Sequence, residues 1–157
     1  MQNWRKEFNS TGMVMHALYG AIFIYIAVMY LVPVPAHPSS IQNTIFMILM
    51  ILGLSSFPIS FFIAGQIMSM EQLEKIRREY NGEKRLEEAV SSVRAGTLIM
   101  AALGEAYGLY GLVFYFLSGD RVRPWFLFAG ALIHYFLTAK ILEASHRQIK
   151  ELWTLSL

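Results

Sequence analysis

The stretch IQNTIFMILMILGLSSFPISFFIAGQIMSM, residues 41–70, contains no acidic, basic or histidine side chain. About 20 apolar residues in a helix are enough to cross the hydrocarbon core of a bilayer, so this stretch can span one. Three further stretches share its character, with one or two ionisable side chains each. The four predicted spans are residues 12–34, 41–70, 95–119 and 124–142. We predict an all-α, integral membrane four-helix protein, because a helix satisfies its backbone hydrogen bonds internally and lipid cannot.

The composition of the whole chain agrees with a membrane location. Of its 157 residues, 55% are hydrophobic and only 15% are charged. The net charge of +2 does not indicate a nucleic-acid partner, because the basic residues alternate with glutamates beside the predicted spans. The chain has no cysteine, which excludes disulfides and thiolate metal sites. We expect a single membrane domain over residues 1–157, whose first apolar run is too long for a cleaved signal peptide.

The distribution of lysine and arginine predicts the orientation. The connections at 35–40 and 120–123 hold two of the 13 basic residues, and all the others lie at the opposite ends of the spans. By the positive-inside rule, both termini and the loop between the second and third spans are cytoplasmic. We expect a multi-pass protein of the cell inner (plasma) membrane.

The loop between the second and third spans is predicted to be helical. Apolar residues recur there at helical spacing, Asn81-Gly82 interrupts the helix, and the C-terminal tail continues the fourth span. The positions expected to face one another are Met70, Leu73, Ile76, Tyr80, Leu86, Ala89, Val90, Val93, Leu142, Ser145, Ile149 and Leu152. We therefore expect the helices to extend into the cytoplasm and to pack there as a small bundle.

The sequence carries an internal repeat. Residues 16–31 align with 101–116 at a constant offset, with matches that include Tyr25 and Tyr110. Residues 59–68 align with 133–142 in the same way. Because both copies enter the membrane from the same side, we predict two tandem parallel-repeat hairpins. The first repeat covers about 12–80 and the second about 83–153.

Glu105 lies near the middle of the third predicted span, where an ionisable residue is a functional hypothesis by default. Ala101, Gly104, Gly108 and Gly111 give this helix a face of small residues, which allows another helix to approach closely. Glu105 lies at the edge of that face. We therefore expect its side chain to point into protein.

His134 is the predicted partner of Glu105. Counting outward from the turn at 119–123 places the two residues at similar depth on antiparallel helices, so a hydrogen bond between them is expected. In the first repeat the equivalent positions are Gly20 and Ser60. The pair is an ion-binding candidate; the alternatives are a purely structural contact between helices and a site for a ligand or lipid headgroup.

Two weaker candidates remain. His16 and His134 could bracket a haem, since histidines on facing transmembrane helices are the axial ligands of b-type cytochromes. The two do not form a double pair, however, and we predict no cofactor and no metal site.

Pro58 is expected to kink the second span, as a packing bend or as a gating hinge. No motif of a soluble enzyme occurs, so we do not expect an enzyme.

The run GEAYGLYGLV, residues 104–113, resembles the ion-binding helix of the proteolipid subunits that form the rotor rings of F-type and V-type ATPases. In that family a carboxylate is followed by a similar stretch. The resemblance implies that Glu105 binds a proton or a sodium ion. The chain also looks like uncharacterised four-helix bacterial membrane proteins with a glutamate in the third span.

The function expected from the sequence is that of a non-enzymatic membrane subunit, in a larger complex or in a homo-oligomer. Its expected partners are the lipid bilayer and other membrane subunits or copies of itself. The first alternative is a rotor-like proteolipid that translocates protons or sodium with Glu105. The second is a haem-binding membrane anchor of a redox complex.

Overall fold

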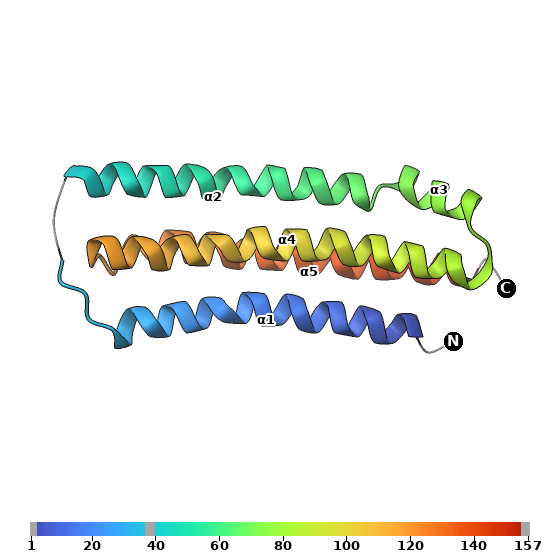
Figure 1. The fold of residues 1–157 in the computed structure, drawn as a ribbon, viewed down its shortest axis with the longest axis horizontal. Coiled ribbons are helices and arrows are strands. Elements are labelled where there is room, and N and C mark those ends of the chain that lie inside the picture. Colours follow the sequence, from blue (N-terminus) through green and yellow to red (C-terminus); the bar gives the residue numbers. More distant parts are fainter. Residues whose placement is uncertain (1–2, 37–39, 155–157) are drawn as a thin grey trace.

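The structure is a computed structural model that describes residues 3–36 and 40–154, and this part of the chain is helical with no strand. Four long helices run in alternating directions, and one short helix connects the second and third of them (Figure 1). The elements are α1 (Asn3–Leu31), α2 (Ser40–Ile67), α3 (Met70–Glu79), α4 (Gly82–Ser118) and α5 (Pro124–Thr154). The all-α prediction is confirmed.

All four long helices are long and apolar enough to cross a membrane. With a rise of 1.5 Å per residue, the 28 residues of α2 extend over about 42 Å and the 37 residues of α4 over about 56 Å. Both lengths exceed the hydrocarbon thickness of about 30 Å. The first predicted span, 12–34, runs slightly too far, because α1 ends at Leu31 before the extended segment that contains Pro33 and Pro35.

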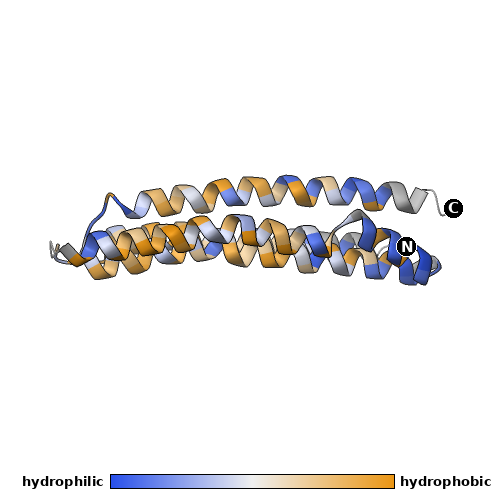
Figure 2. Ribbon diagram, turned by 90° about the horizontal axis from the view of Figure 1, so that it is seen from above, coloured by the Kyte–Doolittle hydropathy of each residue, from blue (hydrophilic) through white to orange (hydrophobic). Residues whose placement is uncertain are grey.

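Helix α4 is the centre of the bundle. It packs against α1, α2 and α5. Helices α1 and α2 lie on opposite sides of α4, and α5 lies on one face of the resulting row α1–α4–α2 (Figures 1 and 2). Only α4 and α5 therefore pack as a close hairpin, and the described parts of α1 and α2 do not pack along each other. The packing does not reproduce two equivalent hairpins.

Helices α1 and α4 differ in side-chain size at aligned positions. Gly104, Gly108 and Gly111 of α4 allow α1 and α5 to approach it closely. The aligned positions of α1 carry bulky side chains, Tyr19, Phe23 and Ile26. Helix α1 therefore has no glycine face at these positions.

The charged end of the bundle contains a second apolar cluster. Leu73 of α3 packs there with residues of α4 and with Ile149 of α5. Ser69 caps α3, since its Oγ accepts a hydrogen bond from the backbone N–H of Gln72 at 3.1 Å. The buried residues of the cluster are Leu73, Leu86, Ala89, Val90, Val93 and Ile149. These positions lie as the helical spacing predicts; the side chains of Met70 and Leu152 are outside the described residues.

The turn between α4 and α5 closes the opposite end. Gly119 ends α4 with φ +68°, a left-handed conformation that favours glycine. The Tyr115 hydroxyl donates a hydrogen bond to the Val32 carbonyl and accepts one from the Val34 N–H at 3.3 Å. The extended segment after α1 is thereby fixed to α4. Of the predicted connection 35–40, residues 37–39 lie outside the described part of the chain.

Large apolar side chains lie on the outside of the bundle, and several polar ones lie inside. Phe62 of α2 is 68% exposed and Phe136 of α5 is 64% exposed, whereas Ser60 and His134 are fully buried. Hydrophobic residues extend along most of the bundle, and hydrophilic ones gather at the end where the termini lie (Figure 2). Water-soluble bundles show the opposite distribution.

Helix α2 continues through Pro58 without a break in its assignment. Proline removes one backbone hydrogen bond. In the preceding turn the Oγ atoms of Ser55 and Ser56 donate to the carbonyls of Leu52 and Gly53, at 2.9 and 2.7 Å. The kink at this position stays a prediction.

Candidate functional site

The ring of His134 lies where all four long helices meet. Its Nδ1 is 2.8 Å from the Tyr19 hydroxyl of α1, and its Nε2 is 2.8 Å from the Ser60 Oγ of α2. On α4, Gly104 faces the ring so closely that a Cβ at this position would lie 2.5 Å from Nδ1. A glycine is therefore required at 104 for the histidine to reach α1.

Hydroxyl groups bond to both nitrogens of the His134 ring. The Ser60 Oγ also donates to the Phe57 carbonyl at 2.8 Å, and the Thr138 Oγ1 donates to the His134 carbonyl at 2.9 Å. Each ring nitrogen thus has a hydroxyl partner on another helix. The Thr138 Oγ1 also lies 3.3 Å from the Tyr19 hydroxyl and from Nδ1.

Aromatic rings of α2 enclose the histidine. Phe57 meets it edge-on with a centroid distance of 4.8 Å, and Phe61 stacks on it at 5.4 Å. These rings leave the imidazole with no exposed surface. A low-dielectric surrounding strengthens hydrogen bonds that are made and makes unpaired polar groups costly, so this network favours one arrangement of the four helices.

Glu105 does not bond to His134, contrary to the prediction. The Tyr25 hydroxyl of α1 donates a hydrogen bond to Glu105 Oε1 instead. The predicted depth is right, because the neighbouring Gly104 touches the His134 ring. One residue further along a helix is a rotation of about 100°, which turns Glu105 away from α5 and toward the seam between α1 and α4. Its side chain is half-buried there.

The four small residues of α4 are buried inside the monomer. Gly104 faces His134, and a Cβ at Gly108 would lie 2.9 Å from Ile22 of α1. A Cβ at Gly111 would lie 2.9 Å from Phe128 of α5. Ala101 is fully buried as well. This small-residue face therefore receives α1 and α5 of the same chain and is not open to another subunit.

The two histidines considered for haem have different surroundings and different hydrogen-bond partners. His16 is exposed, and its Nδ1 lies 3.0 Å from the Tyr135 hydroxyl. Both nitrogens of His134 are bonded to Tyr19 and Ser60, so neither is free to bind iron. Within the described ranges, no group of three or more His, Asp or Glu side chains could hold a metal ion.

The hydroxyl partners of this core were not predicted from the sequence. Tyr19, Tyr25 and Thr138 carry no signal beyond being polar groups at helical spacing within apolar spans. Ser60 had a signal, because the internal repeat aligns it with His134. In the structure these two aligned residues bond to each other.

Tyr107 is a further buried polar residue. Its ring lies between Gly53 of α2 and Gly130 of α5, where added Cβ atoms would lie 2.6 and 2.9 Å from it. Its hydroxyl is buried and has no hydrogen-bond partner in the described structure. The ring thus supports packing, while the hydroxyl adds a desolvation cost.

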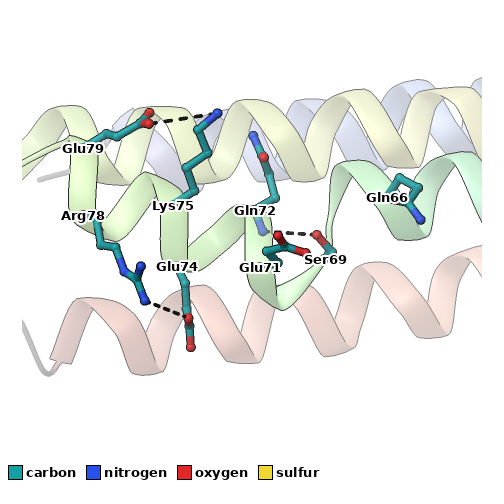
Figure 3. A pocket seen from close by; sticks show the side chains of 8 residues that line it. All are labelled: Gln66, Ser69, Glu71, Gln72, Glu74, Lys75, Arg78 and Glu79. Carbon is teal, nitrogen blue, oxygen red and sulfur yellow. Dashed lines mark hydrogen bonds and ion pairs between the residues drawn. The ribbon is translucent and has the colours of Figure 1, made fainter.

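A polar hollow lies far from this core, on the outer side of α3 (Figure 3). Two ion pairs cross it, Lys75–Glu79 at 4.0 Å and Arg78–Glu74 at 3.7 Å. All four side chains are exposed, and such pairs contribute little to stability. The hollow has the character of a solvated helix face and not of a binding site.

The fold and the core together define an all-helical protein with four apolar helices long enough to cross a bilayer and a hydrogen-bonded interior. Comparison with protein-family models, with curated proteins and with solved structures finds no match for this chain.

Proposed function

We propose that this chain is a non-enzymatic, multi-span membrane protein that serves as a subunit of a larger membrane assembly. The main observation behind this proposal is that polarity is distributed opposite to that of a water-soluble bundle. Large apolar side chains lie outside, and hydrogen-bonded polar side chains lie inside. Lipid is the solvent that stabilises such a surface. The four helices would cross the bilayer, and the charged end with α3 and both termini would lie in the cytoplasm.

The His134 network supports a structural role. The Tyr19 and Ser60 hydroxyls bond to the two nitrogens of His134 and so join α1 and α2 to α5. Hydrogen bonds between membrane helices contribute on average about 0.6 kcal/mol each. Two such bonds at one ring, together with the aromatic enclosure, hold α1, α2 and α5 in register around α4.

The test is native mass spectrometry of the protein extracted gently from its own membrane. This measurement reports the number of copies, any co-purifying subunit and any bound cofactor together. The proposal expects the chain to be found with at least one other chain, whether a copy or a different protein, and without haem. A single chain with no companion would overturn it.

Ion translocation is a second candidate, and one observation favours it. Glu105 is only half-buried and pairs with Tyr25 at the edge of the bundle, outside the sealed His134 core. A carboxyl group in such a place can exchange a proton or a sodium ion, as in the rotor proteolipids that residues 104–113 resemble.

Glu105→Gln separates the two candidates. A scaffold tolerates this change, because glutamine keeps the shape and an acceptor for the Tyr25 hydroxyl. A translocating carboxyl loses its function, since an amide does not titrate. The measurement is proton or sodium flux in proteoliposomes made with wild type and variant. Flux in the wild type that vanishes in the variant would establish translocation and overturn the purely structural role.

A further inference from the structure

One face of the helix row α1–α4–α2 is covered by α5, and no described segment covers the opposite face (Figures 1 and 2). On α4, Ala102 and Leu109 lie two residues from Gly104 and Gly111, which contact α5. Two residues correspond to a rotation of about 200°, so these side chains point away from α5. We call Ala102, Ala106, Leu109 and Val113 the open face; all but the half-buried Ala106 are exposed.

Glu105 lies along one edge of the open face. It is bonded to Tyr25 of α1, and therefore belongs to the seam between α1 and α4. Ionisable residues at mid-membrane almost always face protein or water and not lipid. Among the described contacts only one carboxyl oxygen of Glu105 is paired. This edge is thus incomplete in the single chain.

Tyr110 lies along the other edge. Tyr107 and Phe114, on the same side of α4, contact Phe57 and Phe46 of α2. Tyr110 is placed between them on that side, at the seam with α2. It is half-buried, and its hydroxyl forms no hydrogen bond with the described residues. The open face therefore has an acceptor along one edge and an unused donor along the other.

Tyr25 and Tyr110 lie at similar levels along their parallel helices, because the ring of Tyr25 lies beside Gly108 of α4 and tyrosine rings point back toward the helix N-terminus. Tyr110 is aligned with Tyr25, and both Tyr25 and Ile22 of α1 lie beside Gly108 of α4. Tyrosine side chains on a helix point back toward its N-terminus, and Tyr25 reaches Glu105 in this way. A tyrosine at the depth of Tyr110 on a parallel helix has the same reach.

We propose that a second copy of this chain covers the open face, related by a two-fold axis perpendicular to the membrane. A two-fold axis brings the Glu105 edge of one copy against the Tyr110 edge of the other, twice. Each Glu105 then accepts a hydrogen bond from Tyr25 of its own chain and a second from Tyr110 of the second copy. Ala102 and Ala106 allow the two α4 helices to approach closely. This inference rests on the proposed role in a membrane assembly and names the partner.

Cysteine cross-linking in the native membrane is the first test, and the chain contains no cysteine that would interfere. Single cysteines at Ala102, Leu109 and Val113 should form dimers with a mild oxidant, because disulfides need Cα atoms within about 7 Å. The matched control is Phe136→Cys on the outer side of α5, which is also exposed and should remain monomeric. Cross-linking at 136 but not at the open face would overturn the proposal.

Tyr110→Phe is the second test. It removes a hydroxyl that forms no hydrogen bond with the described residues of its own chain, so the fold should be unaffected, while each dimer loses two hydrogen bonds. Two membrane hydrogen bonds of about 0.6–1.7 kcal/mol each correspond to about 8- to 300-fold in affinity. We expect the dimer to weaken by a factor in this range, measured by single-molecule photobleaching in bilayers. Tyr30→Phe, at an exposed tyrosine of α1, is the control and should change nothing.

The outcomes distinguish this inference from the proposed function. A single copy bound to other subunits would overturn the two-fold pair and leave the function standing. A single copy without any companion would overturn both. A dimer that is insensitive to Tyr110→Phe would overturn the assignment of Tyr110 as the donor to Glu105.

Discussion

Gly104→Ala is the most informative single change in the core. The added Cβ would lie 2.5 Å from His134 Nδ1 and also against the Tyr19 hydroxyl. Both atoms belong to the hydrogen bond that joins α1 to α5. The methyl group therefore has to separate these two side chains or displace α4.

The loss of stability caused by Gly104→Ala is measured against the variant Gly20→Ala. A Cβ at Gly20 has nothing within 4 Å, so this control reports only the gain in helix propensity, which both variants share. Overpacking costs about 1–3 kcal/mol, and the lost Tyr19–His134 bond about 0.6 kcal/mol. We expect Gly104→Ala to be less stable than Gly20→Ala by about 2–4 kcal/mol.

The assay is reversible unfolding in mixed detergent micelles, followed by far-UV circular dichroism. The double variant Gly104→Ala/Tyr19→Phe should recover part of the loss, because it removes one of the two atoms that the methyl group meets. If Gly104→Ala and Gly20→Ala unfold at the same denaturant fraction, Gly104 does not make room for His134 and the description of the core is wrong.

Three further changes test other parts of the structure by the same unfolding measurement. Tyr107→Phe should be neutral or stabilising by up to about 1–3 kcal/mol, because it removes a buried hydroxyl that has no partner; a clear loss of stability would show that this hydroxyl is bonded. Ser60→Ala should destabilise by about 0.6–1.7 kcal/mol, since it removes the partner of His134 Nε2, and no effect would contradict that bond. Leu73→Ala should cost about 2–5 kcal/mol; a smaller loss would mean that α3 does not pack on α4.

The helical class could be predicted from the sequence because lipid imposes a single strong constraint. Uncharged stretches such as 41–70 must be helices if they cross a bilayer. The break at Asn81-Gly82 and the buried faces of α3 and of the helix ends also follow from periodicity. These are local properties, and each can be read within one or two turns.

The arrangement of the helices could not be predicted in the same way. The repeat predicted two tandem hairpins, whereas in the structure α4 packs against α1, α2 and α5. Gly104, Gly108 and Gly111 account for the close approach of α1 and α5 only. The small-residue face was visible in the sequence, yet nothing in its composition distinguishes packing within the chain from packing with a partner.

The site shows the limit of counting along helices. Depth depends on the rise per residue, and the level of Glu105 and His134 was obtained correctly from the turn at 119–123. The side of a helix on which a residue lies depends on its rotation about the helix axis, and an error of one residue is an error of about 100°. Gly104, not Glu105, faces the histidine. The partners Tyr19 and Tyr25 belong to α1, and the position of α1 relative to α4 could not be predicted from the sequence.

The central prediction is that the four helices cross a bilayer with both termini on one side. Two exposed residues serve as labelling positions, Glu87 near the start of α4 and Arg121 in the turn before α5. Each is replaced by a single cysteine, and the chain has no other cysteine. Labelling of intact cells with a membrane-impermeant maleimide should modify the cysteine at 121 and leave the cysteine at 87 unmodified until the membrane is opened. Modification of both positions from the same side would contradict the membrane-spanning topology and, with it, the proposed function.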